Sequence, residues 1–543
     1  MTVDGRTMAD RLSISIGEML PLSARRTPDK PCFLFPDGGW HSFALTNSRV
    51  NRLVSALRAQ GVRRGDRLAV FALDSHRYME IVLAAMKLGA VYVPLNYRLT
   101  RPEVDVLLDR STPVAVFYDV RYADLLAGIR ERHTGVRLFV ALDERPDEPE
   151  SEFDRLVGTG DDAEPPVICT DRDTIALAFT SGTTGLPKGV VQSQRMLKNI
   201  TYAGIIDYRA RPDDVRYCAA PTFHISGVCG LFMGVAFGFT SLVLPQFDAA
   251  TAQRFMADDQ LTAVFLVPTM ISSVLQLPGV ADHAYERLRL ITYGASAMSP
   301  ALLRRAIDTF GCDFLQAFGA GTEAGLQAVL PPEDHRRALE GKPELLASTG
   351  KPSYGVAMRI VDEDMRDVAP GQVGEVATRS DQVMDGYLDM PEETERAFRD
   401  GWFRAGDMGY LDDEGYLYLH GRSKDMIIRG GENIYPAEIE TVLAEYPAVA
   451  QSAVIGVPDE HWGEVVRAFV TLRTGHEATT DQLATHCAER LAKYKVPAEF
   501  VLMPQLPTNA SGKILKRELR RWPAVAAATP AAVPSPDRET ADH

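Results

Sequence analysis

Strand-like and helix-like segments alternate near the start of the chain, and this alternation restricts the fold more than any other feature. A hairpin turn at 37–39 precedes a segment, 45–60, with apolar residues at helical spacing, which ends at Gly61. The apolar run 67–73 has the character of a buried strand, and a second helix and strand follow over 78–96. This order predicts a parallel sheet with helices outside it, and therefore the α/β class.

Length and charge narrow the function classes. At 543 residues the chain is too long for one hydrophobic core, so we expect at least two domains. The net charge of −15 leaves no basic field, so nucleic acid is excluded as a partner. The six cysteines are scattered, which is typical of reduced thiols in the cytoplasm. The first residues lack an apolar core, so we expect no secretory signal.

One uncharged stretch, 217–247, raises the question of a membrane span, because 227–244 is long enough to cross a bilayer. Three glycines interrupt this stretch and a proline follows it. We therefore expect a buried helix and a buried strand here, and no transmembrane span.

The predicted domain boundary lies near 421–425. Beyond it, 433–472 has the pattern helix, strand, turn, strand, which indicates a compact α+β unit. The acidic, proline-rich segment 142–165 is expected to be a surface connection. The predicted division is a large N-terminal domain, a small C-terminal domain and a disordered Ala/Pro-rich tail, at 1–423, 424–523 and 524–543.

The stretch TSGTTGLPKG, at 180–189, carries the clearest chemical signal. It follows a predicted strand, 174–180, and contains three glycines, four hydroxyl residues and a lysine. Glycines let consecutive N–H groups turn inward, hydroxyls add donors and lysine supplies a countercharge, so the stretch predicts a phosphate loop rather than a flexible surface turn. The Walker pattern G-x-x-x-x-G-K-S/T does not fit it. The full string resembles the phosphate loop of the adenylate-forming superfamily, which contains acyl-CoA synthetases, peptide-synthetase adenylation domains and luciferases.

This resemblance extends from about residue 27 to residue 520 and implies a fold and cofactors. It implies a large N-terminal domain of parallel-rich sheets flanked by helices, and a small mobile α+β domain with its hinge at Lys424. It also implies ATP and Mg²⁺, with a carboxylic acid converted to acyl-AMP and pyrophosphate. The loop residues implied to bind the nucleotide are Thr180, Ser181, Gly182, Thr183, Thr184, Gly185 and Lys188.

The stretch LQAFGAGTEAG, at 315–325, resembles a second motif of the superfamily. The resemblance implies that Thr322 bonds phosphate, that Glu323 helps to hold Mg²⁺ and that Phe318 lies near adenine. Phe318 replaces the usual tyrosine and the motif has one extra residue, so the aromatic register stays open. The stretch also fits a Rossmann fingerprint, G-x-G-x-x-A after a strand, but Pro331 and Pro332 come too soon for the required helix.

Three further motifs supply candidate residues. The turn YGASAMSP, at 293–300, resembles the adenine pocket of the superfamily and contributes Gly294, Ala295 and Ser296. Asp407 in GWFRAGD resembles the ribose-binding aspartate, with Arg422 as the accompanying ribose and phosphate contact. Lys513, near the C-terminus, resembles the catalytic lysine that bridges the substrate carboxylate and the α-phosphate. Such cations are needed because each like-charge contact at 4 Å costs about 4 kcal/mol at an effective dielectric of 20.

His224, in APTFHISG, bears on the substrate. Adenylation domains for amino acids carry in this region an Asp that pairs with the ammonium group, whereas no carboxylate occurs here, so we expect an acid without an α-amine. A lone histidine is more often a packed core residue, but the motif resembles the gate between acyl pocket and thiol tunnel of acyl-CoA synthetases, which makes His224 a catalytic candidate beside Lys513, Thr322 and Glu323. The glycines of 227–238 are expected to leave room for an apolar acyl or ring group.

Coenzyme A is the expected acceptor of the acyl group. Gly430 and Gly431 offer bare backbone past which a pantetheine arm could run, and Trp462 and Tyr494 are candidates for stacking on the CoA adenine. The sequence thus predicts a cytoplasmic, ATP-dependent acyl-CoA ligase of fatty acid metabolism. Two alternatives stay open, a stand-alone ligase that loads a carrier-protein thiol and a non-catalytic nucleotide-binding protein. The class of acid (aliphatic, branched, aryl or polycyclic) and the oligomeric state, for which a homodimer is one option, also stay open.

Overall fold

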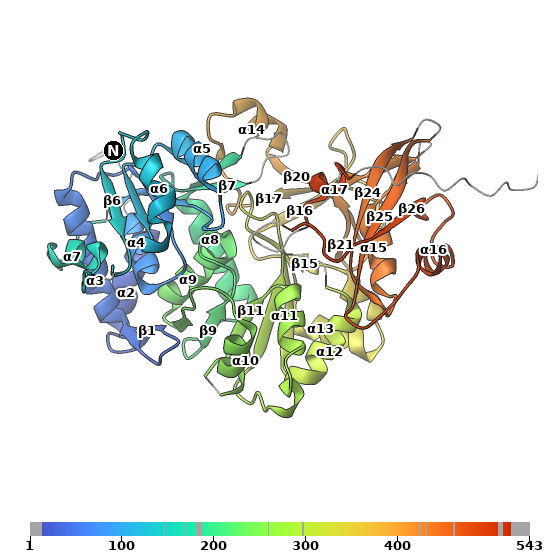
Figure 1. Ribbon diagram of the computed structural model, residues 1–543, viewed down its shortest axis with the longest axis horizontal. Coiled ribbons are helices and arrows are strands. Elements are labelled where there is room, and N and C mark those ends of the chain that lie inside the picture. The colour runs from blue at the N-terminus through green and yellow to red at the C-terminus, as the bar shows by residue number, and fades with distance from the viewer. Residues whose placement is uncertain are drawn as a thin grey trace, which may run out of the picture. The chain divides into compact units, whose positions relative to one another are not determined.

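The computed structural model describes most of the chain, namely residues 13–145, 147–167, 169–180, 187–258, 260–295, 298–422, 425–429, 432–459, 462–508 and 514–522. The chain divides into two compact units, Met1–Lys424 and Asp425–His543. Unit 1 is α/β and unit 2 is α+β (Figure 1). The predicted fold class is therefore confirmed. The predicted tail, 524–543, lies outside the described residues.

The first sheet of unit 1 has seven strands in the described residues, in the order β18-β8-β7-β4-β3-β5-β6. Strands β7, β4, β3, β5 and β6 are parallel to one another, and β8 and β18 continue the sheet with antiparallel pairing. The strands are β3 (Arg67–Phe71), β4 (Val91–Pro94), β5 (Ala115–Tyr118), β6 (Leu138–Ala141), β7 (Thr174–Thr180), β8 (Lys188–Ser193) and β18 (Gly386–Tyr387).

Helices cover both faces of this sheet because its strands are apolar on both sides. Leu68 and Val70 of β3 belong to one hydrophobic cluster, and Ala69 and Phe71 to another. Alternate side chains of a strand point to opposite faces, so these two clusters are the two helix-covered layers. The helices of the first layer are α2 (Met19–Arg26), α3 (Phe43–Ala59), α4 (His76–Leu88) and α7 (Glu152–Gly158), and those of the second are α5 (Arg101–Ser111) and α6 (Ala123–Arg130).

The second sheet has nine strands in the described residues, in the order β15-β14-β13-β12-β11-β9-β10-β1-β2. Its strands are β1 (Pro31–Leu34), β2 (Trp40–Ser42), β9 (Val215–Cys218), β10 (Thr240–Leu242), β11 (Ala263–Leu266), β12 (Leu290–Gly294), β13 (Asp313–Gly319), β14 (Leu326–Leu330) and β15 (Lys351–Pro352). Strands β1 and β2 form the predicted hairpin. Strands β13 and β14 form an antiparallel hairpin around the FGAGTEAG motif, so no helix follows β13 directly and the Rossmann alternative is excluded.

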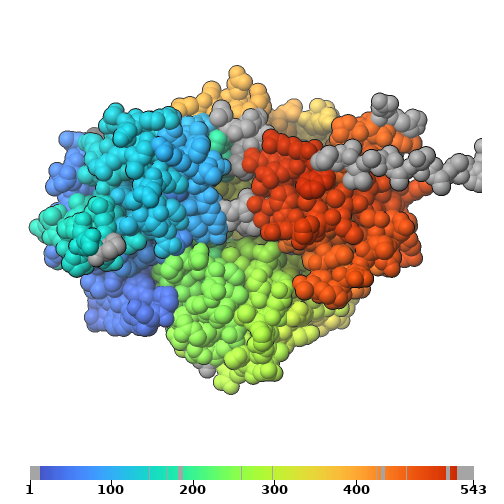
Figure 2. All heavy atoms as spheres, viewed as in Figure 1, coloured from blue at the N-terminus to red at the C-terminus, as the bar shows by residue number. Residues whose placement is uncertain are grey.

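Six helices accompany the second sheet, and the last strands of unit 1 form a third. The helices are α8 (Gln194–Asp207), α9 (Ile225–Phe237), α10 (Ala249–Ala257), α11 (Pro268–Leu275), α12 (Pro300–Phe310) and α13 (Pro332–Glu340). In Figure 2 the blue and cyan helices of the first sheet and the green helices of the second cover different parts of the surface of unit 1. The antiparallel third sheet consists of β16 (Ala357–Val361), β17 (Gly374–Arg379), β19 (Phe398–Arg399), β20 (Trp402–Leu411) and β21 (Leu417–Arg422), and α14 (Pro391–Ala397) precedes β19.

Unit 2 is a sheet with helices. Its strands are β22 (Ile427–Arg429), β23 (Glu432–Ile434), β24 (Val449–Asp459), β25 (Gly463–Leu472) and β26 (Glu499–Leu502), and its helices are α15 (Pro436–Ala444), α16 (Thr480–Ala488) and α17 (Lys516–Leu519). Its core contains Ile439 and Leu443 of α15 packed with Val454 of β24 and Val466 of β25. The order α15, β24, β25 is the predicted helix, strand, turn, strand.

Of two expectations from the sequence, the one for the uncharged stretch is confirmed and the one for segment 142–165 is wrong in part. The uncharged stretch forms the buried helix α9 and the strand β10, and no helix in the described part of the chain is long and apolar enough to cross a membrane. The expectation that 142–165 is only a surface connection is wrong in part, since it contains α7. Phe153 and Val157 of α7 stand one helical turn apart and are buried against α3, so this segment also contributes to the core.

Candidate active site

The candidate residues of unit 1 gather where strands of the two large sheets end. Thr180 is the last residue of β7, Gly294 the last of β12 and Gly319 the last of β13. The Thr180 hydroxyl donates to Oε1 of Glu323, at 3.5 Å, and so links the first sheet to the turn between β13 and β14. Parallel sheets bind ligands at the carboxyl ends of their strands, which makes this junction the candidate active site.

Glu323 is a half-buried carboxylate, and its hydrogen-bond partners among the described residues are neutral groups. The Tyr387 hydroxyl donates to its Oε1 at 3.5 Å, beside the contact from Thr180. Burial raises the pKa of Glu323, and the charge of Arg422 opposes that rise. The turn itself is fixed by hydrogen bonds from Met384 N to the Glu323 carbonyl, at 2.8 Å, and from Gln192 Nε2 to the Thr322 carbonyl, at 2.9 Å. A half-buried carboxylate on a fixed turn, whose pKa is raised by desolvation, favours a cation beside it.

Lys188, the lysine of the predicted phosphate loop, is the first residue of β8. Its ammonium group forms an ion pair with Glu393 of α14 and lies 4.8 Å from the centroid of the Tyr387 ring. Tyr387 therefore stands between Lys188 and Glu323. The other loop residues of the prediction, Ser181, Gly182, Thr183, Thr184 and Gly185, lie outside the described residues.

Asp407 and Arg422 are neighbours on adjacent strands of the third sheet. They are directly opposite in the antiparallel register of β20 and β21, and Arg422 Nε lies 3.2 Å from Asp407 Oδ1. Asp407 is buried, and Arg422 is near enough to Glu323 to influence its pKa. The fold thus brings together Thr180, Glu323 and Arg422, with Asp407, from segments far apart in the sequence.

The end of β12 is tightly constrained. A Cβ on Gly294 would lie 2.2 Å from the carbonyl oxygen of Ala317 on β13, so only glycine fits between these strands. The next residue, Ala295, has a φ of +68°, a left-handed conformation that costs energy for a residue with a side chain. Phe318 is half-buried and packs against a cluster of Ala328, Ile360, Val376 and Leu417. Ser296 lies outside the described residues.

His224 is the N-cap of α9 and is held in an aromatic setting. Its ring centroid lies 4.3 Å from that of Phe223, and Phe223 makes an edge contact with Tyr97 at 5.5 Å. Nε2 of His224 is buried and has no hydrogen-bond partner in the described part of the chain. Burial, with the charge of Arg98, lowers the pKa of His224 to about 4, so the imidazole is neutral at neutral pH.

The turn that precedes His224 is anchored by the first sheet. Thr222 N lies 3.1 Å from each carboxylate oxygen of Asp74, and the Tyr92 hydroxyl donates to the Thr222 carbonyl, also at 3.1 Å. The Tyr78 and Tyr92 hydroxyls are 2.6 Å apart, which fixes Tyr92 in turn. Burial raises the pKa of Asp74 to about 7 although Thr222 N–H favours its ionised form.

The expectation that the glycines of α9 leave room for an acyl group is wrong at three positions. A Cβ on Gly227 would lie 2.3 Å from the Pro221 carbonyl oxygen. A Cβ on Gly230 would lie 3.0 Å from Cys218 Cβ, and one on Gly234 would lie 2.6 Å from the Ser241 hydroxyl. These glycines serve close packing of α9 on its neighbours, and protein atoms fill the space beside them.

In unit 2, the two aromatic candidates lie near one arginine. The Arg429 guanidinium lies 5.5 Å from the centroid of the Trp462 ring and donates to the Tyr494 carbonyl at 2.7 Å. Both aromatic residues are exposed. The remaining candidates of the prediction, Lys424, Gly430, Gly431 and Lys513, lie outside the described residues.

Several residues near the site were not found from the sequence. Four of them stand in no recognisable motif, and the fold brings each into contact with a candidate residue or with the turn that carries one. They are Tyr387, Glu393, Gln192 and Asp74. Arg110 of α5 is similar: it donates to the carbonyls of Pro187 and of Leu388, the latter at 3.3 Å, and lies 6.0 Å from the Phe179 ring centroid. No signal in the sequence pairs these residues, because their partners lie far away in the chain.

Comparisons with known proteins cover both units. A family model described as "AMP-binding enzyme" matches residues 20–388, and one described as "AMP-binding enzyme C-terminal domain" matches residues 438–513. The fatty acid–acyl-carrier-protein ligase ScoC of Streptomyces coeruleorubidus is 36% identical, over 92% of this chain and 94% of its own. The indoleacetate–CoA ligase of Aromatoleum aromaticum is 34% identical, over 94% and 98%. ATP-bound MatB from Rhodopseudomonas palustris superposes with a TM-score of 0.85 at 29% identity, covering 94% of this chain and 99% of MatB.

Proposed function

The chain belongs to the family of AMP-binding enzymes, within the adenylate-forming superfamily, and from this premise we propose that it is an acid–thiol ligase acting with ATP and coenzyme A. A carboxylate oxygen attacks the α-phosphorus of ATP, and pyrophosphate leaves to give acyl-AMP. The CoA thiol then attacks the acyl carbon, and AMP leaves with the electrons of the broken C–O bond. The observation that carries the proposal is the gathering of Thr180, Glu323 and Arg422 at the carboxyl ends of the strands.

In the first step the chain must offset the negative charge of ATP. Asp407 would accept hydrogen bonds from the ribose hydroxyls, with Arg422 beside it as a ribose and phosphate contact. Thr322, Lys188 and the loop at 180–185 would bind phosphate oxygens, and Gly294, Ala295, Ser296 and Phe318 would border the adenine. Lys513, as the resemblance implies, would bridge the substrate carboxylate and the α-phosphate.

The residues present fit Mg²⁺. This ion is usually bound by one or two carboxylates together with substrate phosphates, and Glu323 is a half-buried carboxylate that receives hydrogen bonds from the neutral hydroxyls of Thr180 and Tyr387. No group of three or more His, Cys, Asp or Glu within the described ranges could hold a metal ion by itself, which agrees with a site completed by phosphates. When bound, Mg²⁺ would neutralise phosphate charge, and Glu323 would be its protein ligand.

In the second step, the attack of the CoA thiol on acyl-AMP, residues of unit 2 would hold CoA. Gly430 and Gly431 would flank the pantetheine arm, while Trp462 and Tyr494 would contact the CoA adenine, with Arg429 nearby as a positive charge. The neutral imidazole of His224 would separate the acyl pocket from the thiol. Residues 424–523 would act as a mobile domain with its hinge at Lys424, presenting Lys513 for the first step and Gly430–Gly431 for the second.

The proposed substrate is an apolar monocarboxylate without an α-amine. No carboxylate stands in the His224 motif itself. The carboxyl that the fold does bring there, Asp74, is engaged through both oxygens with the N–H of Thr222. The chain offers no further basis for choosing among straight, branched and ring-bearing acids.

A carrier-protein thiol is a second candidate acceptor, favoured by the 36% identity to ScoC, a ligase named for an acyl-carrier protein. One experiment tests both. ATP–pyrophosphate exchange is measured with amino acids, fatty acids and aryl acids, and the active acids are then assayed for thioester formation with CoA and with a phosphopantetheinylated carrier protein. Exchange with amino acids alone contradicts the substrate class, and thioester formation with the carrier alone favours the second candidate. Absence of exchange with every acid contradicts the ligase proposal.

A further inference from the structure

Lys188, the lysine of the predicted phosphate loop, forms an ion pair with Glu393 of α14. Both side chains are largely withdrawn from solvent, with exposed fractions of 15% and 24%. The ammonium group also lies over the Tyr387 ring, which adds a second favourable contact for the positive charge. A lysine assigned to phosphate binding is therefore already occupied by a carboxylate.

The frame that holds this pair is stiff. Lys188 is on β8, which pairs with β18, and α14 follows β18 in the chain. Tyr387 N donates to the Thr394 hydroxyl of α14 at 2.9 Å. A Cβ on Gly386 would lie 2.8 Å from Thr394 Cγ2, so the helix is packed closely on the strand. The contact between Glu393 and Lys188 is thus set by the backbone of three joined elements, and is not a chance meeting of two flexible side chains.

Glu393 has a second cationic partner. Its other oxygen, Oε1, lies 2.5 Å from a guanidinium nitrogen of Arg396, one turn along α14. The hydrogen bond from Lys188, with the charges of Lys188 and Arg396, sets the pKa of Glu393 below its ordinary value, although burial opposes this, so the carboxylate is ionised at neutral pH. If Lys188 moves to another anion, Glu393 still has Arg396. The pair with Lys188 can therefore open without leaving a carboxylate unpaired.

We propose that Glu393 is a positioning residue that holds Lys188 before nucleotide binds and competes with the phosphates of ATP for it. The inference rests on the proposed role of Lys188 at the phosphates. ATP binding then exchanges one anionic partner of Lys188 for another, so the carboxylate of Glu393 weakens ATP binding and sets its affinity. Neutralising that carboxylate makes Lys188 available at once and removes a like charge from the phosphates.

The test compares two neighbouring variants. Glu393→Gln keeps the shape and the acceptor oxygen but removes the charge. Glu392→Gln is the matched control, since Glu392 is on the same helix, is 84% exposed and lies 3.3 Å from Arg396. ATP dissociation is measured by calorimetry, and the KM for ATP by pyrophosphate exchange. Glu393→Gln should tighten ATP binding about fivefold, the scale of a partly exposed ion pair, with the change in KM rather than in kcat. Glu392→Gln should stay within about twofold of the natural protein.

Two further measurements keep the inference separate from its premise. The gain from Glu393→Gln should shrink as ionic strength rises, because screening weakens the competition between partly exposed charges. Weaker or unchanged ATP binding by Glu393→Gln overturns the inference. Lys188→Ala tests the premise: if it leaves ATP binding unchanged, the phosphate role of Lys188 is wrong. If Lys188→Ala weakens binding while Glu393→Gln has no effect, only the competition is refuted.

Discussion

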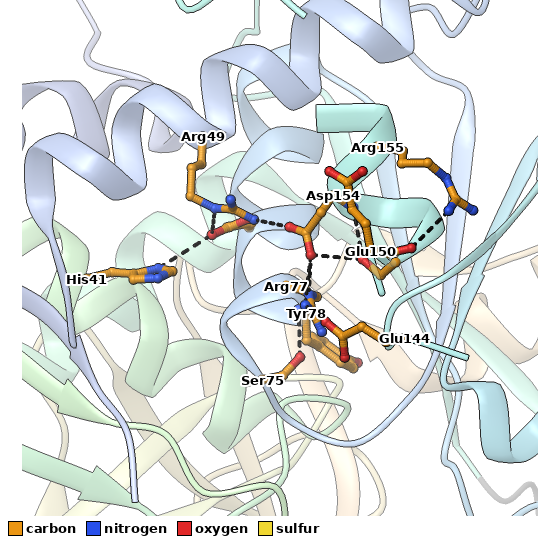
Figure 3. A network of polar contacts seen from close by, with 11 residues as sticks. His41, Arg49, Ser75, Arg77, Tyr78, Glu144, Glu150, Asp154 and Arg155 are labelled. Atoms are coloured by element: carbon orange, nitrogen blue, oxygen red, sulfur yellow. Dashed lines mark hydrogen bonds and ion pairs between the residues drawn. The ribbon is translucent and has the colours of Figure 1, made fainter. Parts of the chain in front are cut away.

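Replacing the buried Glu80 by glutamine should change how the stability of unit 1 depends on pH. Glu80, on α4, is fully buried; its Oε1 lies 2.7 Å from Arg49 Nε, and its Oε2 has no partner within the described residues. Figure 3 shows Arg49 and Arg77 converging on Asp154, so Arg49 is shared between two carboxylates. Burial raises the pKa of Glu80 from its ordinary 4.5 to about 7, and Arg49 only partly opposes this.

The sign and size of the effect follow from proton linkage. Between pH 4.5 and about 7 the folded protein keeps a proton on Glu80 that the unfolded chain has released, so this residue's contribution to the free energy of unfolding falls as pH rises. At about 1.36 kcal/mol per unit, the loss is about 3 kcal/mol. Nearby His76, whose pKa burial lowers to about 3, has the opposite trend, but it is common to both proteins and cancels in their difference.

The assay is urea unfolding of both proteins at a series of pH values. The free energy of unfolding of Glu80→Gln minus that of the natural protein should increase by about 3 kcal/mol from pH 4.5 to above pH 7. Glu144→Gln is the control within the same network, because its own backbone N–H and Arg77 lower the pKa of Glu144 from its ordinary 4.5. The free energy of unfolding of that variant minus that of the natural protein should fall as pH rises toward 4.5 and stay level above it. A difference for Glu80→Gln that is flat, or that falls with pH, refutes the reasoning.

Three further predictions concern the site. Asp407→Ala should weaken nucleotide binding by about 2–4 kcal/mol, the loss of a bidentate charge-assisted contact, with every acid alike; unchanged ATP KM and kcat would make Asp407 a structural residue only. Lys513→Ala should slow acyl-AMP formation about 10²–10³-fold yet still convert supplied acyl-AMP and CoA to thioester. Gly431→Trp should block that thioester formation and leave acyl-AMP formation nearly intact. Single-turnover assays in which either variant slows both half-reactions equally would contradict the domain movement at Lys424. Asp74→Asn keeps an acceptor for Thr222 N but removes a carboxyl whose pKa is raised to about 7. The pH dependence of the rate of thioester formation should therefore lose its inflection near pH 7. An unaltered pH–rate profile would show that Asp74 does not act on the His224 turn.

The elements that could be predicted are those with local periodicity. The helical spacing of apolar residues over 45–60 identified α3, and the run 174–180 identified β7. In both cases the pattern of apolar residues lies within one continuous stretch of chain, and such a pattern is enough to predict a helix or a strand. The same holds for α15, β24 and β25 in unit 2. Motif residues such as Glu323 and Asp407 were also available from the sequence, because each stands in a contiguous pattern.

Contacts between distant segments could not be predicted. Asp74 bonds the N–H of Thr222 across 148 residues, and Lys188 pairs with Glu393 across 205. Neither pair has a periodicity or a motif, since each depends on how separate elements are placed against one another. The glycines of α9 show the same limit. Their spacing predicts room for a ligand, but whether a missing side chain leaves space depends on the neighbouring strands, and here Cys218 and Ser241 fill it.

The charges at the site fall into two groups that suit different tasks. Asp407 and Arg422 are opposite each other in a β-ladder, so their separation is set by the backbone and they suit recognition of a part of the substrate that does not react. Glu323 and Lys188 differ from that pair. Within the described residues, Glu323 is contacted by the neutral hydroxyls of Thr180 and Tyr387 at 3.5 Å, and Lys188 pairs with Glu393, which also pairs with Arg396. In the proposed mechanism both change partners when Mg·ATP arrives, the lysine moving to phosphate and the carboxylate gaining a divalent cation. A carboxylate with neutral partners gains a counter-charge when the divalent cation arrives, and the pair of Lys188 with Glu393 can open because Glu393 keeps Arg396. Both rearrangements cost less than breaking a buried pair that would leave one charge without a partner.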